Sequence, residues 1–229
     1  MRAMILAAGR GERLRPLTDL CPKPLIQVAG KPLIVYHLEN LHAAGITDIV
    51  INLGHLGEQI FAALGQGEAW DVKITYSWES PILEVGGGIF KALPLLGEEP
   101  FMIVNGDIWT DYPLSELPHH PNGLAHLVLV NNPAHNLKGD FAINEQGRLC
   151  NQSFNTYTYS GVSVLHPALF AGCPANVAFR LRPLLDKALE NQQLMGEYYR
   201  GQWTDVGTLE RLDQLQQMLL TSTKSKAID

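Results

Sequence analysis

The sequence is poor in cysteine and has no long apolar run. Its three cysteines stand far apart, at Cys21, Cys150 and Cys173, and form no Cys-x-x-Cys pair. This spacing favours neither a disulfide framework nor a cysteine zinc site, and it is typical of a reducing, cytoplasmic setting. No apolar stretch reaches the roughly 18 residues that a transmembrane helix needs. We therefore expect no membrane partner, and we interpret residues 1–8 as a first strand and not as a signal peptide.

Positive charge is also scarce. Seventeen lysines and arginines stand against 23 acidic residues, which gives a net charge of −6. Such a balance argues against a nucleic-acid or anionic membrane partner. Residues 10–23 are the exception, because they hold four cations and only two acidic residues. This local excess suits a phosphate-bearing small molecule.

Strand and helix patterns alternate in the first half of the chain. Residues 2–8 form a nearly continuous apolar run, as expected of a strand buried on both faces. Proline at the start and glycine just past the end favour a helix over 33–44. The pattern continues with strands at 48–53, 72–76 and 101–105 and helices at 57–64 and 89–96. Repeated strand-helix units predict an α/β, Rossmann-like fold with a mostly parallel central sheet and helices on both faces.

The second half carries more strands and fewer helices. We predict strands at 124–130, 140–144, 157–165 and 195–199, and helices at 181–190 and 208–220. Neither a low-complexity linker nor an internal repeat separates the halves. Residues 1–229 are therefore interpreted as one domain, in which the second half extends the sheet and closes over its carboxyl edge. The polar tail, 221–229, is expected to be frayed.

A loop rich in glycine and arginine, residues 6–18, follows the first strand. It lies where open parallel sheets bind ligands, and Gly9 and Gly11 would let the backbone approach an anion closely. A dinucleotide motif would need a third glycine where Leu14 stands, and a Walker loop would need Gly-Lys-Ser/Thr. A structural loop with solvated arginines is the alternative. A second feature follows at Lys23, which lies between two prolines, so that its backbone has little freedom and is not expected to lie inside a helix.

Taken together, residues 6–18 and 22–25 resemble the signature of the sugar-1-phosphate nucleotidyltransferases. A match of this length is far more specific than a bare Gly-x-Gly. The resemblance covers residues 1 to about 220 and implies the nucleotide-diphospho-sugar transferase fold, which is GT-A-like. It also implies a nucleotide-binding half at 1–112 and a sugar-binding half at 113–220. In the implied reaction a sugar-phosphate oxygen attacks the α-phosphorus of a nucleoside triphosphate, and pyrophosphate leaves.

Two aspartates lie in motifs that such enzymes use for magnesium. Asp107 ends the strand at 101–105 in a Gly-Asp pair, and Asp205 lies in the late Trp-x-Asp-x-Gly-Thr segment. Taken singly, they are typical of a turn after a strand and of a helix N-terminus. The resemblance implies that they hold Mg²⁺ together. Two carboxylates supplemented by substrate phosphates and water suit this ion.

The resemblance assigns the remaining site residues by their position in the family's motifs. Catalytic contacts to the phosphates fall to Arg15 and Lys23. Nucleotide-binding positions are Ala8, Gly9, Gly11, Glu12, Arg13, Lys23, Glu79 and Gly86. Sugar-binding positions are Asn105, Gly139, Asp140 and Glu197.

Three further segments resemble a group of short enzymes within the family, the N-acetylmuramate 1-phosphate uridylyltransferases, which act in cell-wall recycling. They are residues 83–94, 104–112 and 203–208. The mannose-1-phosphate guanylyltransferases share the loop and metal motifs and are the alternative. Residues 151–155 lack the Glu-Lys-Pro typical of the tetrameric thymidylyltransferases, which indicates a different sugar. We expect a monomer or a small homo-oligomer.

Two hypotheses come from other classes of protein. A non-catalytic sugar-nucleotide sensor of the same fold would be expected to lose a metal aspartate or Lys23, and the sequence retains them. A nicotinamide-dependent oxidoreductase would need an acidic residue at the end of the second strand, where Asn52 stands.

Overall fold

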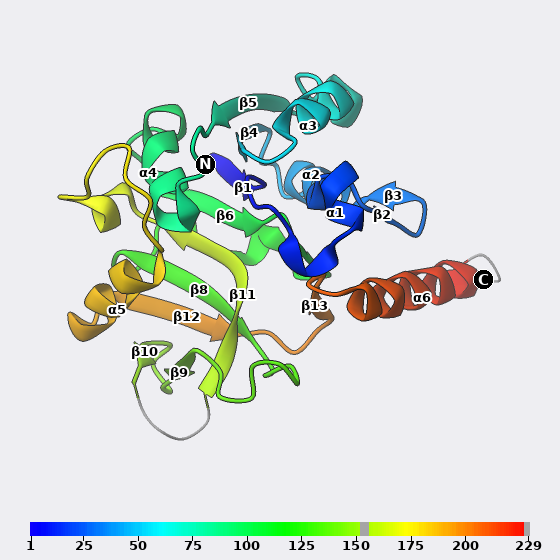
Figure 1. The fold of residues 1–229 in the computed structure, drawn as a ribbon. Helices are drawn as coiled ribbons and strands as arrows, with labels where there is room; N and C mark the ends of the chain where they lie inside the picture. Colours follow the sequence, from blue (N-terminus) through cyan, green and yellow to red (C-terminus); the bar gives the residue numbers. More distant parts are fainter. Residues whose placement is uncertain (152–155, 227–229) are drawn as a thin grey trace.

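A computed structural model, which describes residues 1–151 and 156–226, is built around one large twisted sheet (Figure 1). Strand β1 (Ala3–Leu6) lies inside the sheet and pairs in parallel with β4 (Asp48–Leu53) and β6 (Phe101–Asn105). Because the three strands are parallel, their carboxyl ends meet at one edge of the sheet. The loops that follow them therefore converge there.

The second half of the chain extends the same sheet with mostly antiparallel strands. Strand β11 (Thr156–Leu165) runs antiparallel to β6 and to β8 (Ala125–Val130). Strand β12 (Leu194–Tyr198) then pairs in parallel with β8. The remaining strands of the sheet are β5 (Lys73–Trp78), parallel to β4, and the short pair β9 (Phe141–Ile143) and β10 (Leu149–Cys150). The predicted extension of the sheet is confirmed.

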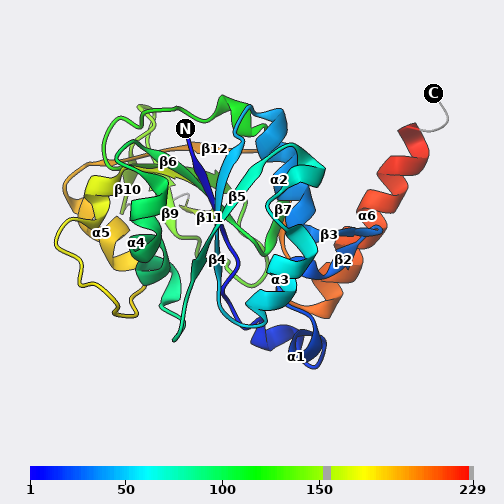
Figure 2. The same ribbon diagram turned by 90° about the horizontal axis from the view of Figure 1, so that it is seen from above.

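Helices cover both faces, as Figure 2 shows. The helices α2 (Leu33–Ala43) and α3 (Gly57–Leu64) pack on one face, and α4 (Glu84–Leu96) and α5 (Arg182–Glu190) on the other. Strand β1 supplies both cores by simple alternation, because Ala3 and Ile5 join the first cluster and Met4 joins the second.

Short elements surround the carboxyl edge of the sheet. Strand β7 (Ile108–Thr110) pairs antiparallel with β13 (Trp203–Asp205), so the end of the chain returns to the end of β6. Helix α6 (Leu209–Lys226) then extends away from the body of the molecule (Figure 1). The others are α1 (Leu17–Leu20), β2 (Gln27–Val28), β3 (Lys31–Pro32) and the 3-10 turns Glu12–Leu14, Lys23–Leu25, Glu68–Trp70, Leu114–Glu116 and Pro167–Phe170.

Three local predictions are corrected. Helix α4 begins at Glu84 and not at residue 89, so it contains Gly86, Gly87 and Gly88. These glycines are needed for close packing against neighbouring residues and not for capping the helix. Lys23 lies in a 3-10 turn and not outside helical structure. The tail is helical as far as Lys226, whereas 227–229 lie outside the described residues, as do 152–155 of the stretch compared above. Among the described residues, no helix has both the length and the apolarity to cross a membrane.

Candidate active site

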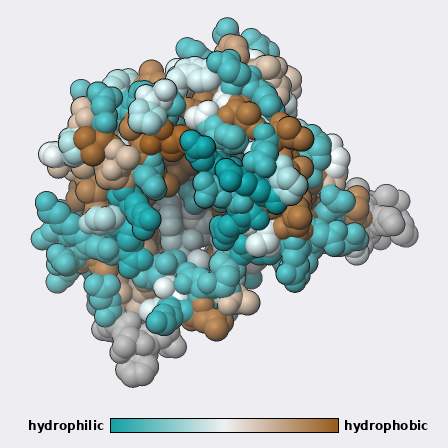
Figure 3. All heavy atoms as spheres, in the orientation of Figure 1, coloured by the Kyte–Doolittle hydropathy of each residue, from teal (hydrophilic) through white to brown (hydrophobic). Residues whose placement is uncertain are grey.

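A pocket of about 820 Å³ opens at the carboxyl ends of β1, β4 and β6. A hollow bordered largely by hydrophilic side chains marks the centre of this face in Figure 3. The wall is built by the glycine-rich loop, by the strand ends and by the segment that leads into α4. Nine of the residues predicted from the sequence line it: Ala8, Gly9, Gly11, Glu12, Arg13, Lys23, Glu79, Asn105 and Asp107.

The loop after β1 is held in shape by Gly11. This residue has a φ of +64°, and a Cβ here would lie 2.8 Å from Thr18 Cγ2. Its carbonyl accepts hydrogen bonds from Thr18 Oγ1 (2.9 Å) and from the amide of Leu14 (2.9 Å), and the Leu14 side chain is buried. Gly11 is therefore tied to the segment that follows it, and residues 9–13 line the pocket.

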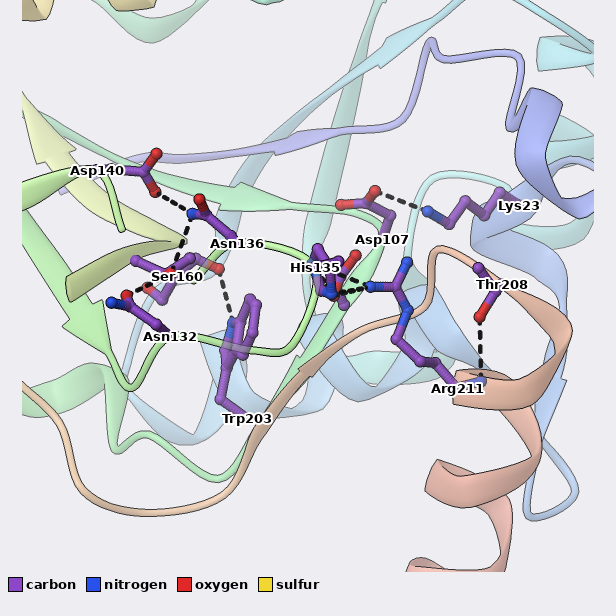
Figure 4. A network of polar contacts seen from close by, with 12 residues as sticks. Lys23, Asp107, Asn132, His135, Asn136, Asp140, Ser160, Trp203, Thr208 and Arg211 are labelled. Carbon is purple, nitrogen blue, oxygen red and sulfur yellow. Dashed lines mark hydrogen bonds and ion pairs between the residues drawn. The ribbon is translucent and has the colours of Figure 1, made fainter. Parts of the chain in front are cut away.

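Lys23 meets Asp107 on the pocket wall. The Lys23 Nζ donates to Asp107 Oδ2 at 2.7 Å (Figure 4). The lysine side chain is only 10% exposed and the aspartate 39%. Pro22 and Pro24 flank the lysine and restrict the backbone on both sides. The cation thus has a fixed position on the pocket wall.

Asp205 lies next to this pair through its backbone. It pairs with Ile108 between β13 and β7, and the amide of Val206 donates to the carbonyl of Asp107 at 2.7 Å. Asp205 is not part of the pocket lining, and its Oδ1 lies 3.0 Å from Arg211 Nη1 and 3.2 Å from His135 Nε2. Of the two predicted metal ligands, Asp107 therefore lies in the turn before β7 and Asp205 at the end of the adjoining strand β13, and each has a cationic neighbour.

A neutral histidine lies beneath Asp107. His37 of α2 is fully buried, and within the described part of the chain its Nε2 has no hydrogen-bond partner. Burial lowers the pKa of His37 to about 4, and the charge of Asp107 and a hydrogen bond with the backbone of Ile108 oppose this only in part. The imidazole is therefore uncharged at neutral pH.

A buried chain of hydrogen bonds holds Glu79 in place on the pocket wall. Asn52 Oδ1 accepts from the amide of Ala7 (2.7 Å), and its Nδ2 donates to Glu79 Oε1 (2.7 Å). The other oxygen of Glu79 accepts from the amide of Leu83 (2.8 Å). Gly88 leaves room for this contact, because a Cβ there would lie 2.4 Å from Glu79 Oε1. Asn52, which also lines the pocket, was not predicted as a site residue. Its polar side chain near the end of a largely apolar strand could have indicated this role.

The predicted sugar residues lie in two places. Asn105 lines the pocket and packs on Gly161, where a Cβ would come within 2.6 Å of Asn105 Nδ2. Gly139 and Asp140 lie outside the pocket lining. Asp140 Oδ2 accepts from the amide of Tyr159 (2.8 Å) and from Asn136 Nδ2 (3.2 Å), as part of the polar network in Figure 4.

Three further predicted residues are not brought to the pocket. Arg15 is half-exposed and pairs with Asp19 at 3.1 Å. Gly86 packs under Phe179, since a Cβ would lie 2.5 Å from that ring. Glu197 accepts a hydrogen bond from the hydroxyl of Tyr112. Burial and this carboxylate together raise the pKa of Tyr112.

These features together define an α/β protein in which a glycine-rich loop lines a pocket at the carboxyl edge of a parallel sheet, where such folds bind ligands. A family model described as nucleotidyl transferase matches residues 2–134. The N-acetylmuramate alpha-1-phosphate uridylyltransferase of Neisseria meningitidis is 48% identical over 226 residues, which cover 94% of this chain and 97% of that protein. The chain belongs to the nucleotidyl transferase family and is a nucleotidyltransferase. The predicted family and enzyme class are confirmed.

The chain also matches more distantly related proteins. The mannose-1-phosphate guanyltransferase of Aspergillus oryzae is 31% identical over 90% of this chain, which spans 61% of that protein. Among solved structures, a Bacillus anthracis protein described as a glucose-1-phosphate thymidylyltransferase matches with a TM-score of 0.83 at 21% identity, over 95% of this chain and 94% of its own. HddC from Yersinia pseudotuberculosis matches with a TM-score of 0.76 at 21% identity, over 95% and 99%. Both confirm the predicted fold.

Proposed function

We propose that this protein transfers a uridylyl group from UTP to N-acetylmuramate 1-phosphate, giving UDP-N-acetylmuramate and pyrophosphate. The observation that carries the proposal is the pair of Lys23 and Asp107, fixed 2.7 Å apart on the wall of a pocket at the carboxyl edge of the sheet. The choice of base and sugar is supported by the relative that is 48% identical over nearly its whole length. The proposed setting is the cytoplasm, in the recycling of peptidoglycan, with the protein as a monomer or small homo-oligomer.

In this reaction an oxygen of the sugar phosphate forms a bond to the α-phosphorus, and the bond from that phosphorus to the pyrophosphate oxygen breaks. The protein needs no covalent intermediate, so its contribution is positioning and neutralisation of charge. The backbone amides of Gly11, Glu12 and Arg13 would bind the outer phosphates. Lys23 would contact the α-phosphate or the incoming sugar phosphate. Arg15 would join them by exchanging Asp19 for a phosphate.

Mg²⁺ is the proposed metal, with Asp107 and Asp205 as its ligands. When bound, it would neutralise charge on the phosphates. In the part of the chain that the structure describes, no three or more histidine, cysteine or acidic residues gather into a metal site. Two carboxylates are nevertheless enough for Mg²⁺, which takes its other ligands from phosphates and water. Asp205 Oδ2 lies next to Gly207, which lines the pocket, so the donors fit this ion.

The nucleotide would occupy residues 1–112, with the base against Ala8, Gly9 and the segment that Glu79 fixes. The sugar would occupy 113–220 together with Asn105. Gly139 and Asp140 are proposed contacts to its hydroxyls, and a contact from Glu197 requires its bond with Tyr112 to open. Gly86 would act through the packing of α4.

Pyrophosphate release tests the proposal directly. The protein would be mixed with Mg²⁺, one of UTP, GTP, dTTP or ATP, and the 1-phosphate of N-acetylmuramate, glucosamine, mannose or glucose. The combination of UTP and N-acetylmuramate 1-phosphate is expected to be fastest, with no release when the sugar is left out. A maximum with GTP and mannose 1-phosphate would instead identify a guanylyltransferase, and no release with any pair would support the sensor.

A further inference from the structure

Arg211 occupies an unfavourable position in the fold. It lies in the first turn of α6, where the helix dipole repels a cation. Its side chain is only 15% exposed, and its Nε is buried without a hydrogen-bond partner among the described residues. Burial of a charge destabilises the fold unless a partner compensates it. Asp205, whose Oδ1 lies 3.0 Å from Arg211 Nη1, is that partner.

The contact between Arg211 and Asp205 depends on the absence of a side chain at Gly207. A Cβ at this position would lie 2.0 Å from Arg211 Nη2 and 2.9 Å from Asp205 Oδ2. Gly207 itself lines the pocket. The guanidinium and the carboxylate are therefore separated from the substrate space by one glycine.

The geometry of the pair is that of charge neutralisation and not of a well-formed hydrogen bond. Within the described residues, Asp205 Oδ1 is buried and has no aligned hydrogen-bond donor, although the guanidinium of Arg211 and the ring of His135 lie within 3.2 Å. The His135 ring also meets the guanidinium, with its Nε2 2.9 Å from Arg211 Nη1 (Figure 4). The oxygen that faces Gly207, Oδ2, is the one left for a metal ion.

We infer that Arg211 is a placeholder cation, which neutralises Asp205 in the free protein and keeps a divalent metal from binding there until the triphosphate arrives. This inference rests on the proposed metal role of Asp205. Two cations beside one carboxylate repel each other strongly in a partly buried site. When the nucleotide binds, the negative charge of its phosphates offsets this repulsion, so that Arg211 and the metal ion can both lie beside Asp205. The free protein therefore binds metal weakly, and metal enters together with the triphosphate.

Binding of Mn²⁺ alone, without nucleotide, tests the inference. Free Mn²⁺ would be measured by electron paramagnetic resonance in titrations of the wild type, Arg211→Met and Arg211→Lys. Arg211→Met removes the charge and keeps an unbranched apolar side chain, so we expect Mn²⁺ to bind at least about tenfold more tightly. Arg211→Lys keeps the charge and should resemble the wild type. Unchanged or weaker binding in Arg211→Met would overturn the inference, because that is what a merely structural role predicts.

Two additional variants secure the interpretation. Arg211→Gln removes the charge but keeps a polar side chain, so it too should bind Mn²⁺ more tightly, even if Arg211→Met does not fold. Adding Asp205→Asn to either variant should remove the gain, and a gain that persists would contradict the inference. Because these titrations contain no sugar or nucleotide, they are independent of the pyrophosphate assay. If the variants bound Mn²⁺ more tightly but the protein released no pyrophosphate, the proposed reaction would be rejected and the role of Arg211 as a placeholder cation would stand.

Discussion

Lys23 and Asp107, which are 84 residues apart in the sequence, form an ion pair 2.7 Å long on the wall of the pocket. The lysine reaches this position from a turn between two prolines, and the aspartate follows a buried parallel strand. The lysine side chain is only 10% exposed, so the pair presents positive and negative charge at a set distance. Such preorganisation is what transfer of a nucleotidyl group requires of a protein.

The first prediction concerns the charge of Lys23. Lys23→Met keeps the apolar part of the side chain and removes the ammonium group, so kcat is expected to fall by about 100- to 1,000-fold. The measurement is steady-state pyrophosphate release with saturating substrates. Lys31→Met is the matched control, because Lys31 also pairs with an acidic side chain, Glu39 at 2.5 Å, but lies outside the pocket lining. Near-normal turnover of Lys23→Met would contradict the assigned role.

The second prediction concerns the metal. Asp107→Asn retains size and hydrogen bonding but lacks the negative charge, so turnover at a fixed Mg²⁺ concentration should fall by at least about 100-fold. Titration with Mg²⁺ would reveal the cause, since the half-saturating concentration should rise. Asp186→Asn is a suitable control, because this partly exposed aspartate pairs with Arg182, four residues earlier on α5, and does not line the pocket. Equal Mg²⁺ dependence in the two variants would count against the metal role of Asp107.

Sequence patterns predicted the main elements of the fold because burial dictates them directly. The runs at 48–53 and 57–64 coincide with β4 and α3, where apolar periodicity and flanking glycines act in the same direction. Strands β7 and β13 were missed. Each has only three residues, and their pairing across the chain has no local signature.

The candidate site was predictable only where a motif carries it. The glycine-rich loop and Lys23 are local features, and they do line one pocket. Arg211 and His135 were missed because their significance arises from contacts with Asp205 that join three separate segments. The helical start of α4 was misjudged for a similar reason. Its glycines are required by Phe179 and Glu79, which pack against them from other parts of the chain.

The third prediction concerns the buried hydrogen bonds that link Ala7, Asn52 and Glu79 at the pocket. Asn52→Leu removes the partner of the Ala7 amide and leaves Glu79 buried with fewer donors. We expect the free energy of unfolding to fall by about 2–4 kcal/mol, measured by urea denaturation. Asn122→Leu, at an exposed loop position, should change it by less than about 0.5 kcal/mol. An equally small change in the free energy of unfolding for Asn52→Leu would mean that the hydrogen bonds of Asn52 do not hold the loop in place.

The fourth prediction concerns pH and His37. Burial lowers the pKa of this histidine to about 4 from its usual 6.5, so the unfolded chain binds a proton more readily than the folded one. Stability should therefore be fully present above pH 6.5 and should be lost progressively as the pH falls toward 4, by roughly 3 kcal/mol in total. His37→Gln cannot gain this proton, so its unfolding free energy should decline less over the same range. Urea denaturation at several pH values between 4 and 7 measures both slopes, and parallel slopes would show that His37 is not the group responsible.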